Sequence, residues 1–539
     1  MTQTTPTTVR APFVAQHGEV DGVRAVWSDL AVDPTLTLVF GVGYEDATPA
    51  TAGITHLVEH LVMRRVGHVA IPNNAESSLR STSFYAVGPA DQRVDFVARV
   101  CEAVTWLRGI DDADLDLERR TILSELGPSG VYAARDAIST RYGVRGPGLT
   151  AVVHARLLDW TAAEVREVAV RWFHRGNAHL VSTTPLPDGV RVPLPDGPAV
   201  TRAAAPVPVV QGRTCSDADG TDLVLSGTCS TAAHETARAL AASVLRDVLH
   251  ETLRTTLGHV YSVSPLTLAV DPATDLWLLS MDPGPESVDD VLVAALDVVE
   301  RLAAEGPAQA ELDRTRTMVL HELDLSGVRA GWLDAYASCT LRGLPLVTPD
   351  ETRAVADGVT PADVRAVIHQ FAAALLITLP AGHAPQDAVE HRLEAFGAAP
   401  LDLYPDPEGR TGWAFARAIL LGGERGPVLS ALRGGNRVHK GKLASAARGL
   451  KVVVLPDRLV LELPGAFWTI PFADLVLVGS EANGDLELVT SRGGVLTLSP
   501  RDFRGLTRPL TRALDRLPPG VRYRKDRTST EGTAARTTA

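Results

Sequence analysis

Two histidines with a glutamate between them are the residues of this chain best suited to chemistry. His56, Glu59 and His60 form an H-x-x-E-H motif. Residues three and four positions apart are neighbours on a helix surface, about 5–6 Å apart, so these side chains would share one face. Imidazole nitrogens and carboxylate oxygens are zinc ligands. The spacing therefore predicts a metal site on a helix.

A catalytic zinc ion usually takes three protein ligands, so a third must come from elsewhere in the chain. The segment 111–126 has apolar residues at helical intervals and carries Glu118 and Glu125 seven positions apart, two turns along one face. Glu125 is the candidate third ligand. Glu118 is the candidate partner that orients a ligand by a hydrogen bond.

Together these residues resemble the pitrilysin/insulinase family of zinc metallopeptidases, which carry the inverted H-x-x-E-H motif. The resemblance implies that His56, His60 and Glu125 hold one Zn²⁺ per chain. It implies that Glu59 is the general base, acting on a water molecule at the metal. It also implies a two-domain organisation like that of the bacterial and mitochondrial-processing-peptidase branch.

A second match to this family lies far along the chain, in the run from Leu253 to Val263. Arg254, Gly258 and Tyr261 fit the family's L-R-x-x-x-G-x-x-Y-S-V element. In that family the arginine and the tyrosine hold the substrate backbone and stabilise the tetrahedral intermediate, so the resemblance implies these catalytic roles for Arg254 and Tyr261. His259 stands where the family has an apolar residue, and the sequence offers no account of it.

The segment 63–74 departs from the family, because it is short and lacks the usual helix and paired glycines. A peptide-binding edge strand is expected after it, at Asn74 and Ala75, where an extended substrate would add by β-augmentation. Family members of this size form hollow dimers in which the zinc helix of one subunit faces the Arg/Tyr element of the other. A homodimer and a heterodimer with a related peptidase subunit both remain open.

The elements that must position these residues predict an α+β protein. The run Thr35–Phe40 reads as a strand and the run Asp289–Arg301 as an amphipathic helix. Two homologous α/β-layer domains in tandem are expected, because 539 residues are too many for a single core. The catalytic domain would span residues 10–190, and a second peptidase-like domain with the Arg/Tyr pair would span residues 207–385.

An internal repeat supports the two related domains. Residues 123–126 have a counterpart in 320–323, both containing the pair Glu-Leu. In this alignment Thr315 takes the place of Glu118, and the second copy has no H-x-x-E-H motif. Metal chemistry is therefore expected in the first domain only.

The C-terminal part changes character. A connector is expected at residues 386–435, with a short apolar helix at 412–421. Six short strands and a closing helix at 436–518 favour a small β-barrel of the pleckstrin-homology type, followed by a disordered tail at 519–539. All four lysines lie in this part. An ordinary charge excess explains them, and contact with a membrane stays an open alternative.

Several classes of function find no support in the sequence. The net charge of −12 and the lack of a phosphate-binding glycine loop argue against nucleic acid. No secretory signal pattern and no apolar run of about 18 residues is seen. Four cysteines without metal-ligand spacing fit a reducing compartment, so a cytoplasmic protein is expected.

The expected function is that of a zinc-dependent endopeptidase which cleaves short or unfolded peptides and could process a precursor or leader peptide. The alternative is a non-catalytic or partner-dependent subunit of a heterodimeric peptidase that serves as a scaffold. Six residues argue against the scaffold, because it would need neither a base nor a substrate clamp: His56, Glu59, His60, Glu125, Arg254 and Tyr261.

Overall fold

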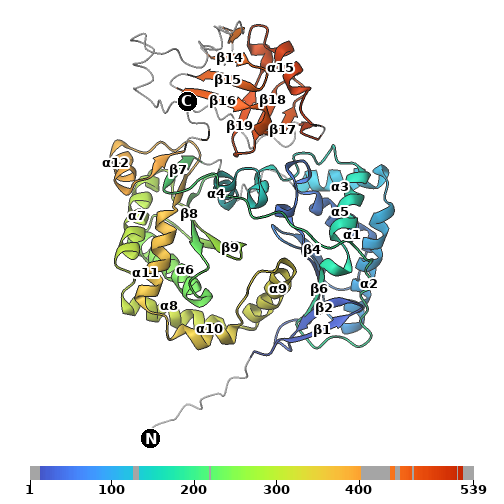
Figure 1. The fold of residues 1–539 in the computed structure, drawn as a ribbon. Helices are drawn as coiled ribbons and strands as arrows, with labels where there is room; N and C mark the ends of the chain where they lie inside the picture. The colour runs from blue at the N-terminus through green and yellow to red at the C-terminus, as the bar shows by residue number, and fades with distance from the viewer. Residues whose placement is uncertain are drawn as a thin grey trace.

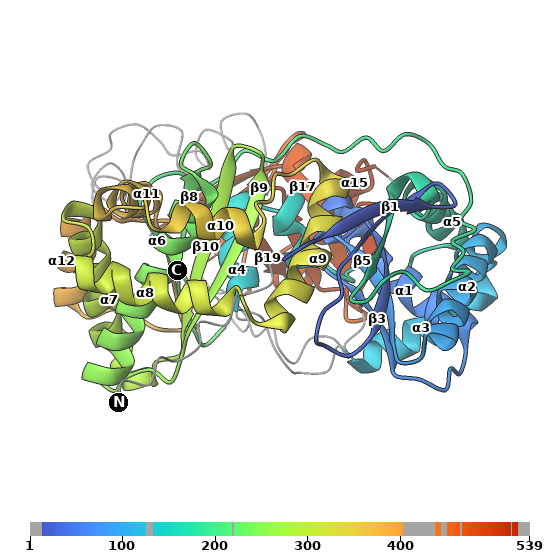
Figure 2. The ribbon, with the colours of Figure 1, turned by 90° about the horizontal axis from the view of Figure 1, so that it is seen from below.

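The structure is a computed structural model, and it describes residues 13–125, 133–217, 220–401, 403, 437–442, 450–463, 466–518 and 520–525. Two α/β domains face each other, and a smaller β-rich domain lies against one side of the pair (Figure 1). Seen from below, the two α/β domains lie side by side with helix α9 between them (Figure 2). In the described part of the chain, no helix is long and apolar enough to cross a membrane.

The first domain is a six-stranded sheet with helices packed on one face. Its strand order is β1-β2-β6-β3-β5-β4, so β4 is an edge strand. The strands are β1 Gln16–Val20, β2 Val23–Trp27, β3 Thr35–Phe40, β4 Asn73–Ser77, β5 Thr82–Val87 and β6 Ala178–Ser182. The helices are α1 Ile54–Val66, α2 Ala90–Trp106, α3 Asp112–Glu125, α4 Ala133–Tyr142 and α5 Ala162–Trp172.

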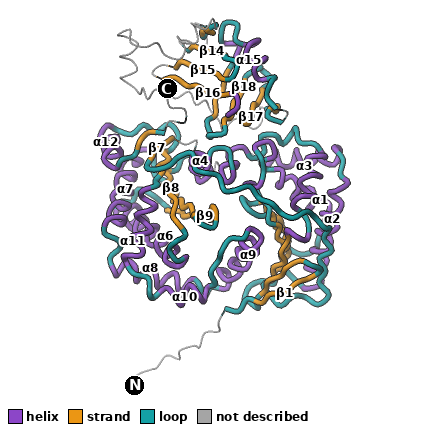
Figure 3. Tube along the Cα trace, in the orientation of Figure 1, coloured by secondary structure: helices purple, strands orange, loops and turns teal. Residues whose placement is uncertain are grey.

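The second domain repeats this plan, with the strand order β12-β7-β11-β8-β10-β9. Its strands are β7 Thr214–Asp217, β8 Leu223–Ser230, β9 Val263–Asp271, β10 Thr274–Met281, β11 Leu376–Leu379 and β12 Ala399–Pro400. Its helices are α6 Glu235–His250, α7 Val288–Ala304, α8 Gln309–Glu322, α9 Ser326–Arg342, α10 Pro349–Ala356, α11 Pro361–Ala373 and α12 Asp387–Phe396. In both domains most helices lie on the outer side and the sheets face inward (Figure 3).

Alternation along the strands explains these layers. In β3, Leu36, Leu38 and Phe40 point into the core beneath the helices, and Val39 belongs to a separate cluster on the opposite face. A sheet with apolar side chains on both faces needs a covering layer on each face, because only then are these side chains removed from water. The second covering layer comes from an exchange of helices between the domains.

Helix α9 belongs to the second domain in sequence but packs on the first sheet. Its Leu333, Ala337 and Leu341 cluster with Val26 and Val181 of that sheet. Helix α4 does the reverse: residues Ala137, Ile138 and Tyr142 cluster with Val224, Leu276 and Leu278 of the second sheet. The two domains are thus tied together by reciprocal helices.

The C-terminal domain consists of two four-stranded sheets, β13-β14-β15-β16 and β19-β18-β17-β20. Their bounds are β13 Val438–Lys440, β14 Lys451–Val454, β15 Arg458–Leu463, β16 Ala466–Pro471, β17 Leu475–Ser480, β18 Leu486–Thr490, β19 Val495–Leu498 and β20 Arg522–Arg524, with helix α15 Thr507–Leu514. The described strands do not close into a barrel, because no strand of one sheet pairs with the other. The expected barrel is corrected to two sheets over a shared core.

Two further differences concern the ends of this region. Part of the expected connector is ordered as α12 and β12, and β12 extends the second sheet by pairing with β7. Residues expected in the C-terminal tail form β20, which pairs in parallel with β17. The expected apolar helix at 412–421 and residues 526–539 lie outside the described part of the chain.

Candidate metal centre

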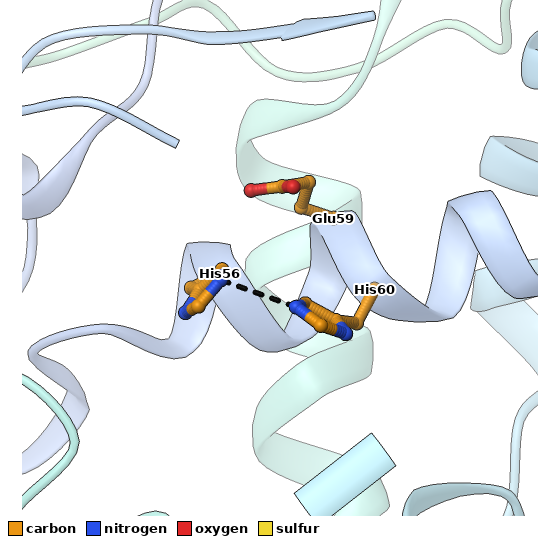
Figure 4. Close-up of side chains that lie close together, drawn as sticks. All are labelled: His56, Glu59 and His60. Atoms are coloured by element: carbon orange, nitrogen blue, oxygen red, sulfur yellow. Dashed lines mark hydrogen bonds between the residues drawn. The ribbon is translucent and has the colours of Figure 1, made fainter. Parts of the chain in front are cut away.

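Helix α1 carries the H-x-x-E-H motif. It starts after Gly53, whose φ of 93° is left-handed, and it ends before Gly67, with a φ of 71°. Leu57 and Leu61 are fully buried in the core of the first domain. This anchored apolar face leaves His56 and His60 directed toward α3, with their imidazoles side by side and Glu59 on the neighbouring side of the helix (Figure 4).

Three ligand atoms converge between α1 and α3. The Nε2 atoms of His56 and His60 are 3.2 Å apart. Glu125, the last residue of α3, places Oε2 3.3 Å from Nε2 of His60 and 3.7 Å from Nε2 of His56. The sequence-predicted ligands are therefore brought together, although Glu125 comes from a different helix.

This triangle has the dimensions that a zinc ion needs. Ligand atoms at about 2.0–2.1 Å from a tetrahedral zinc ion lie roughly 3.3–3.4 Å from one another. The three distances, 3.2, 3.3 and 3.7 Å, bracket that value. Two imidazoles and one carboxylate are also a common donor set of catalytic zinc sites. The residues fit the metal.

Glu118 orients one of the two histidines. Its Oε2 lies 3.2 Å from Nδ1 of His60, and its Oε1 lies 3.7 Å from Nε of Arg64. A carboxylate on the far nitrogen of a ligating histidine fixes the tautomer and makes the ring a better donor. The role expected for Glu118 thus matches its position.

His56 has a partner that the sequence did not indicate. Nε2 of His154 lies 2.9 Å from Nδ1 of His56. Burial is the main cause that lowers the pKa of His56 to about 4 and the pKa of His154 to about 3. Both rings are neutral near pH 7, and neutral imidazole is the form that binds a metal. His154 is 98 residues from His56 in the sequence, so no spacing could reveal it.

Glu59 is 9% exposed and sits beside the histidines. Burial raises the pKa of its carboxyl group, and hydrogen bonds with Ser77 oppose this rise. Ser77 ends β4, the edge strand that contains Asn74 and Ala75, and among the described strands β4 pairs with β5 alone. The candidate base is thereby joined to the free edge of the sheet.

Arg254 and Tyr261 lie together in the second domain. The Arg254 guanidinium stacks 4.7 Å from the centre of the Tyr261 ring, and the Tyr261 residue is 74% exposed. Within the described part of the chain, no hydrogen bond, ion pair or ring contact joins this pair to the metal residues. His259 lies between them, with its backbone N–H bonded to the Leu253 carbonyl and its ring 3.8 Å from Asp290.

Comparisons with known proteins agree with the fold. Residues 208–319 match the family model described as the Peptidase M16 inactive domain. This match lies within the second domain, of which it covers the first part, and that domain lacks the metal motif. No curated protein matches the chain.

Solved structures extend the likeness to both α/β domains. The first half of the periplasmic protease PqqL from Escherichia coli is 14% identical, with a TM-score of 0.55, over 72% of this chain and 97% of that one. The chain spans 56% of full-length PqqL. A peptidase M16 inactive domain from Pseudomonas fluorescens (16% identity, TM-score 0.56, 69% and 99% covered) and a chain of complex III2 from Candida albicans (15%, 0.57, 71% and 99%) are also similar.

These comparisons confirm a mixed α/β fold that resembles M16 peptidase domains. The similar structures include a protease, an inactive domain and a chain of complex III2. At these identities the likeness concerns the fold alone, so the chemistry has to be argued from the side chains.

Proposed function

We propose that this chain is a zinc-dependent endopeptidase. The observation that carries the proposal is the triangle formed by His56, His60 and Glu125, whose size suits tetrahedral zinc. Glu118 contacts Nδ1 of His60 and His154 contacts Nδ1 of His56, so each ring has a partner on the nitrogen outside the triangle. Unrelated charged residues on a helix surface are not expected to place two imidazoles and a carboxylate at these distances.

The side chains divide the work of peptide hydrolysis. A zinc ion held by the triangle would polarise a substrate carbonyl as a Lewis acid. Glu59 accepts the proton of the attacking water and passes it to the leaving amine, which balances the hydrolysis. A raised pKa from burial suits a group that first accepts and then donates a proton.

The substrate we propose is an extended peptide paired with β4. This strand has one free edge, and Ser77 at its end contacts Glu59. Backbone pairing along Asn74 and Ala75 would carry the peptide past the metal residues without requiring a particular sequence. Short or unfolded peptides, including precursor or leader peptides, fit this mode because their backbone can extend along β4 without breaking a folded structure.

A second copy of the chain completes the site in this proposal. Arg254 and Tyr261 are exposed, and no hydrogen bond, ion pair or ring contact in the described part of the chain joins them to the metal residues of their own chain. As donors aimed at the tetrahedral intermediate they would serve the partner's metal centre. Mixed dimers of Glu59→Gln and Tyr261→Phe chains then regain one intact site, whereas sites confined to one chain stay inactive.

The first experiment is digestion of a peptide library by the zinc-loaded chain, with and without a chelator. Glu59→Gln should keep the zinc content and lose about 10²- to 10⁴-fold in turnover, the usual contribution of a general base. Glu102→Gln, an exposed carboxylate on α2, is the matched control and should keep full activity. Full turnover by Glu59→Gln would rule out this mechanism.

The alternative is a non-catalytic or partner-dependent subunit. The match of part of the second domain to an inactive-domain model favours it. A chain that binds zinc but cleaves no peptide, alone or in mixed dimers, would support this alternative over the peptidase.

A further inference from the structure

The two ligand histidines are oriented by different kinds of partner. His60 has the Glu118 carboxylate at 3.2 Å, whereas His56 has the His154 imidazole at 2.9 Å. Because Nε2 of His56 faces the ligand triangle, its Nδ1 carries the proton and donates it to Nε2 of His154. His154 therefore fixes both the tautomer and the rotation of the His56 ring.

The backbone around His154 is built to hold this ring in place. His154 has a φ of 69°, a left-handed conformation that costs free energy for a residue with a side chain. Its N–H donates to the Ala52 carbonyl at 2.9 Å, just before α1. A Cβ atom on Gly53 would lie only 2.8 Å from the His154 ring, so the start of α1 and the His154 loop interlock.

The C-terminal domain supports the other side of this loop. The 3₁₀ segment Gly146–Val152 leads directly into His154. Its Leu149 and Val152 are buried in one apolar cluster with Leu477, Val489 and Tyr523 of the C-terminal domain. Ala52 and Val144 complete this cluster. The loop is thus packed between the metal helix and the C-terminal domain.

Polar contacts strengthen the same interface. The Val144 N–H donates to the Ser491 carbonyl at 3.0 Å, and the Arg524 N–H donates to the Asp159 carboxylate at 2.9 Å. A Cβ atom on Gly143 would lie 2.2 Å from the Ser491 carbonyl, so only glycine allows this approach. The C-terminal domain therefore contacts the chain on both sides of His154, at 143–152 and at Asp159.

We propose that His154 is the positioning residue of His56, and that the docked C-terminal domain raises the zinc affinity of the chain by holding the loop that carries His154. The inference rests on the proposed zinc site. It gives the C-terminal domain a role within the chain, because this domain would hold in place the loop whose His154 orients the metal ligand His56.

The near test compares His154→Met with His154→Gln in the full chain. Methionine and glutamine have similar length and pay the same backbone cost, but only glutamine offers a strong acceptor to His56. We expect His154→Met to lower the zinc affinity about 10- to 100-fold by chelator competition, and His154→Gln to restore most of it. The Co²⁺ absorption bands of the Met variant should shift as the ligand field changes.

The second test disrupts the apolar contact between the C-terminal domain and the loop before His154, without changing a residue of the metal site. Val489 is 2% exposed and Val495, on the neighbouring strand, is 46% exposed. Val489→Asp should lower zinc affinity several-fold, and Val495→Asp should not. In the His154→Met background, Val489→Asp should add little, because both changes act through the same ring. Thermal unfolding of the metal-free variants checks that the fold is retained.

The outcomes test the proposed zinc site, the role of His154 and the role of the C-terminal domain separately. Failure of the unchanged chain to bind zinc overturns the proposed function itself. Zinc binding that is equal in the unchanged chain and in His154→Met overturns the role of His154 alone. Equal affinities of the Val489→Asp and Val495→Asp chains, or fully additive effects of Val489→Asp and His154→Met, overturn the clamping role of the C-terminal domain.

Discussion

The two α/β domains have one scaffold and different chemistry. Five strands of each sheet follow the same order, β2-β6-β3-β5-β4 in the first and β7-β11-β8-β10-β9 in the second, with parallel pairing only at β2–β6 and β7–β11 within these runs. Helices α3 and α8 carry glutamates at matching places of the internal repeat, Glu125 and Glu322. The scaffold alone therefore does not make a metal site.

The difference lies in a few side chains at equivalent places. In the first domain His60 contacts Glu118 across α1 and α3. In the second, Asp247 accepts a hydrogen bond of 2.8 Å from Thr315 across α6 and α8, and Arg246 pairs with the same aspartate. The contact between the helices survives where the ligands are gone. The fold positions the site, and the side chains decide whether a metal binds.

The two exchanged helices, α9 and α4, also differ in the contacts of their anchors, the arginines near their C-terminal ends. Arg342 at the end of α9 contacts Glu45 and lies 2.8 Å from Asp46 in the first domain. Arg141 near the end of α4 donates to the Ser226 and Ala374 carbonyls of the second domain. One anchor neutralises carboxylates, whereas the other satisfies backbone oxygens.

Removing these anchors should give the largest change in stability. Arg342→Ala leaves two buried carboxylates with fewer partners and should lower the free energy of unfolding by about 3 kcal/mol. Arg141→Ala leaves two carbonyls unpaired and should cost about 2 kcal/mol. Denaturant titration measures both, with Arg99→Ala, an exposed pair with Asp95, as the near-neutral control. A larger loss for Arg141→Ala than for Arg342→Ala would reverse the comparison.

Acid should act on one exchanged helix through a buried histidine that the equivalent strand of the other sheet lacks. Burial lowers the pKa of His179, on the α9 face of β6, to about 4. At His179 the folded state then binds fewer protons than the unfolded state between pH 4 and 6.5, so this group lowers the stability as the pH drops through that range, by at most about 3 kcal/mol. Burial raises the pKa of Asp334 on α9 to about 6, which acts in the opposite sense, so the contribution of His179 is read from a variant that lacks it. Strand β11 of the second sheet has no titratable side chain.

The measurement is the pH dependence of the unfolding midpoint for the unchanged chain and for His179→Gln. The variant should show a shallower fall between pH 6.5 and 4. Identical slopes would mean that His179 is not the group that takes up the protons.

The smallest expected effect concerns the residues behind the ligands. Glu118→Gln should lower zinc affinity about 10- to 100-fold, because His60 loses a charged partner. Thr315→Val, at the equivalent place in the second domain, should leave zinc affinity unchanged. Chelator competition distinguishes the two variants, and an equal loss in both would show that the second domain also takes part in metal binding.

Sequence patterns predicted the parts of the molecule that depend on local periodicity. The strand Thr35–Phe40 is seen with the expected bounds, and the described part of the segment 111–126 is helical from Asp112 to Glu125. The C-terminal domain contains short strands followed by a helix, as expected. Spacing on one helix also brought His56 and His60 together. These features follow from side chains a few positions apart, which a sequence displays directly.

Features that depend on tertiary packing were not predictable in this way. His154 reaches His56 only because a loop with a left-handed residue folds back on α1. The exchange of α4 and α9 depends on which sheet each apolar helix face meets, and amphipathicity does not specify the partner. The barrel was wrong for the same reason, since alternation predicts strands but not which strands pair across two sheets.

The most direct test of the central claim compares Glu125→Gln with Glu322→Gln, the last residues of α3 and α8. Zinc affinity and zinc content are measured on the full chains beside the unchanged protein. We expect one zinc ion per unchanged chain and no change in affinity for Glu322→Gln. For Glu125→Gln we expect a loss of affinity above about 100-fold, larger than removal of an outer partner gives. Unaltered zinc binding by Glu125→Gln, or an equal loss in both variants, would contradict it.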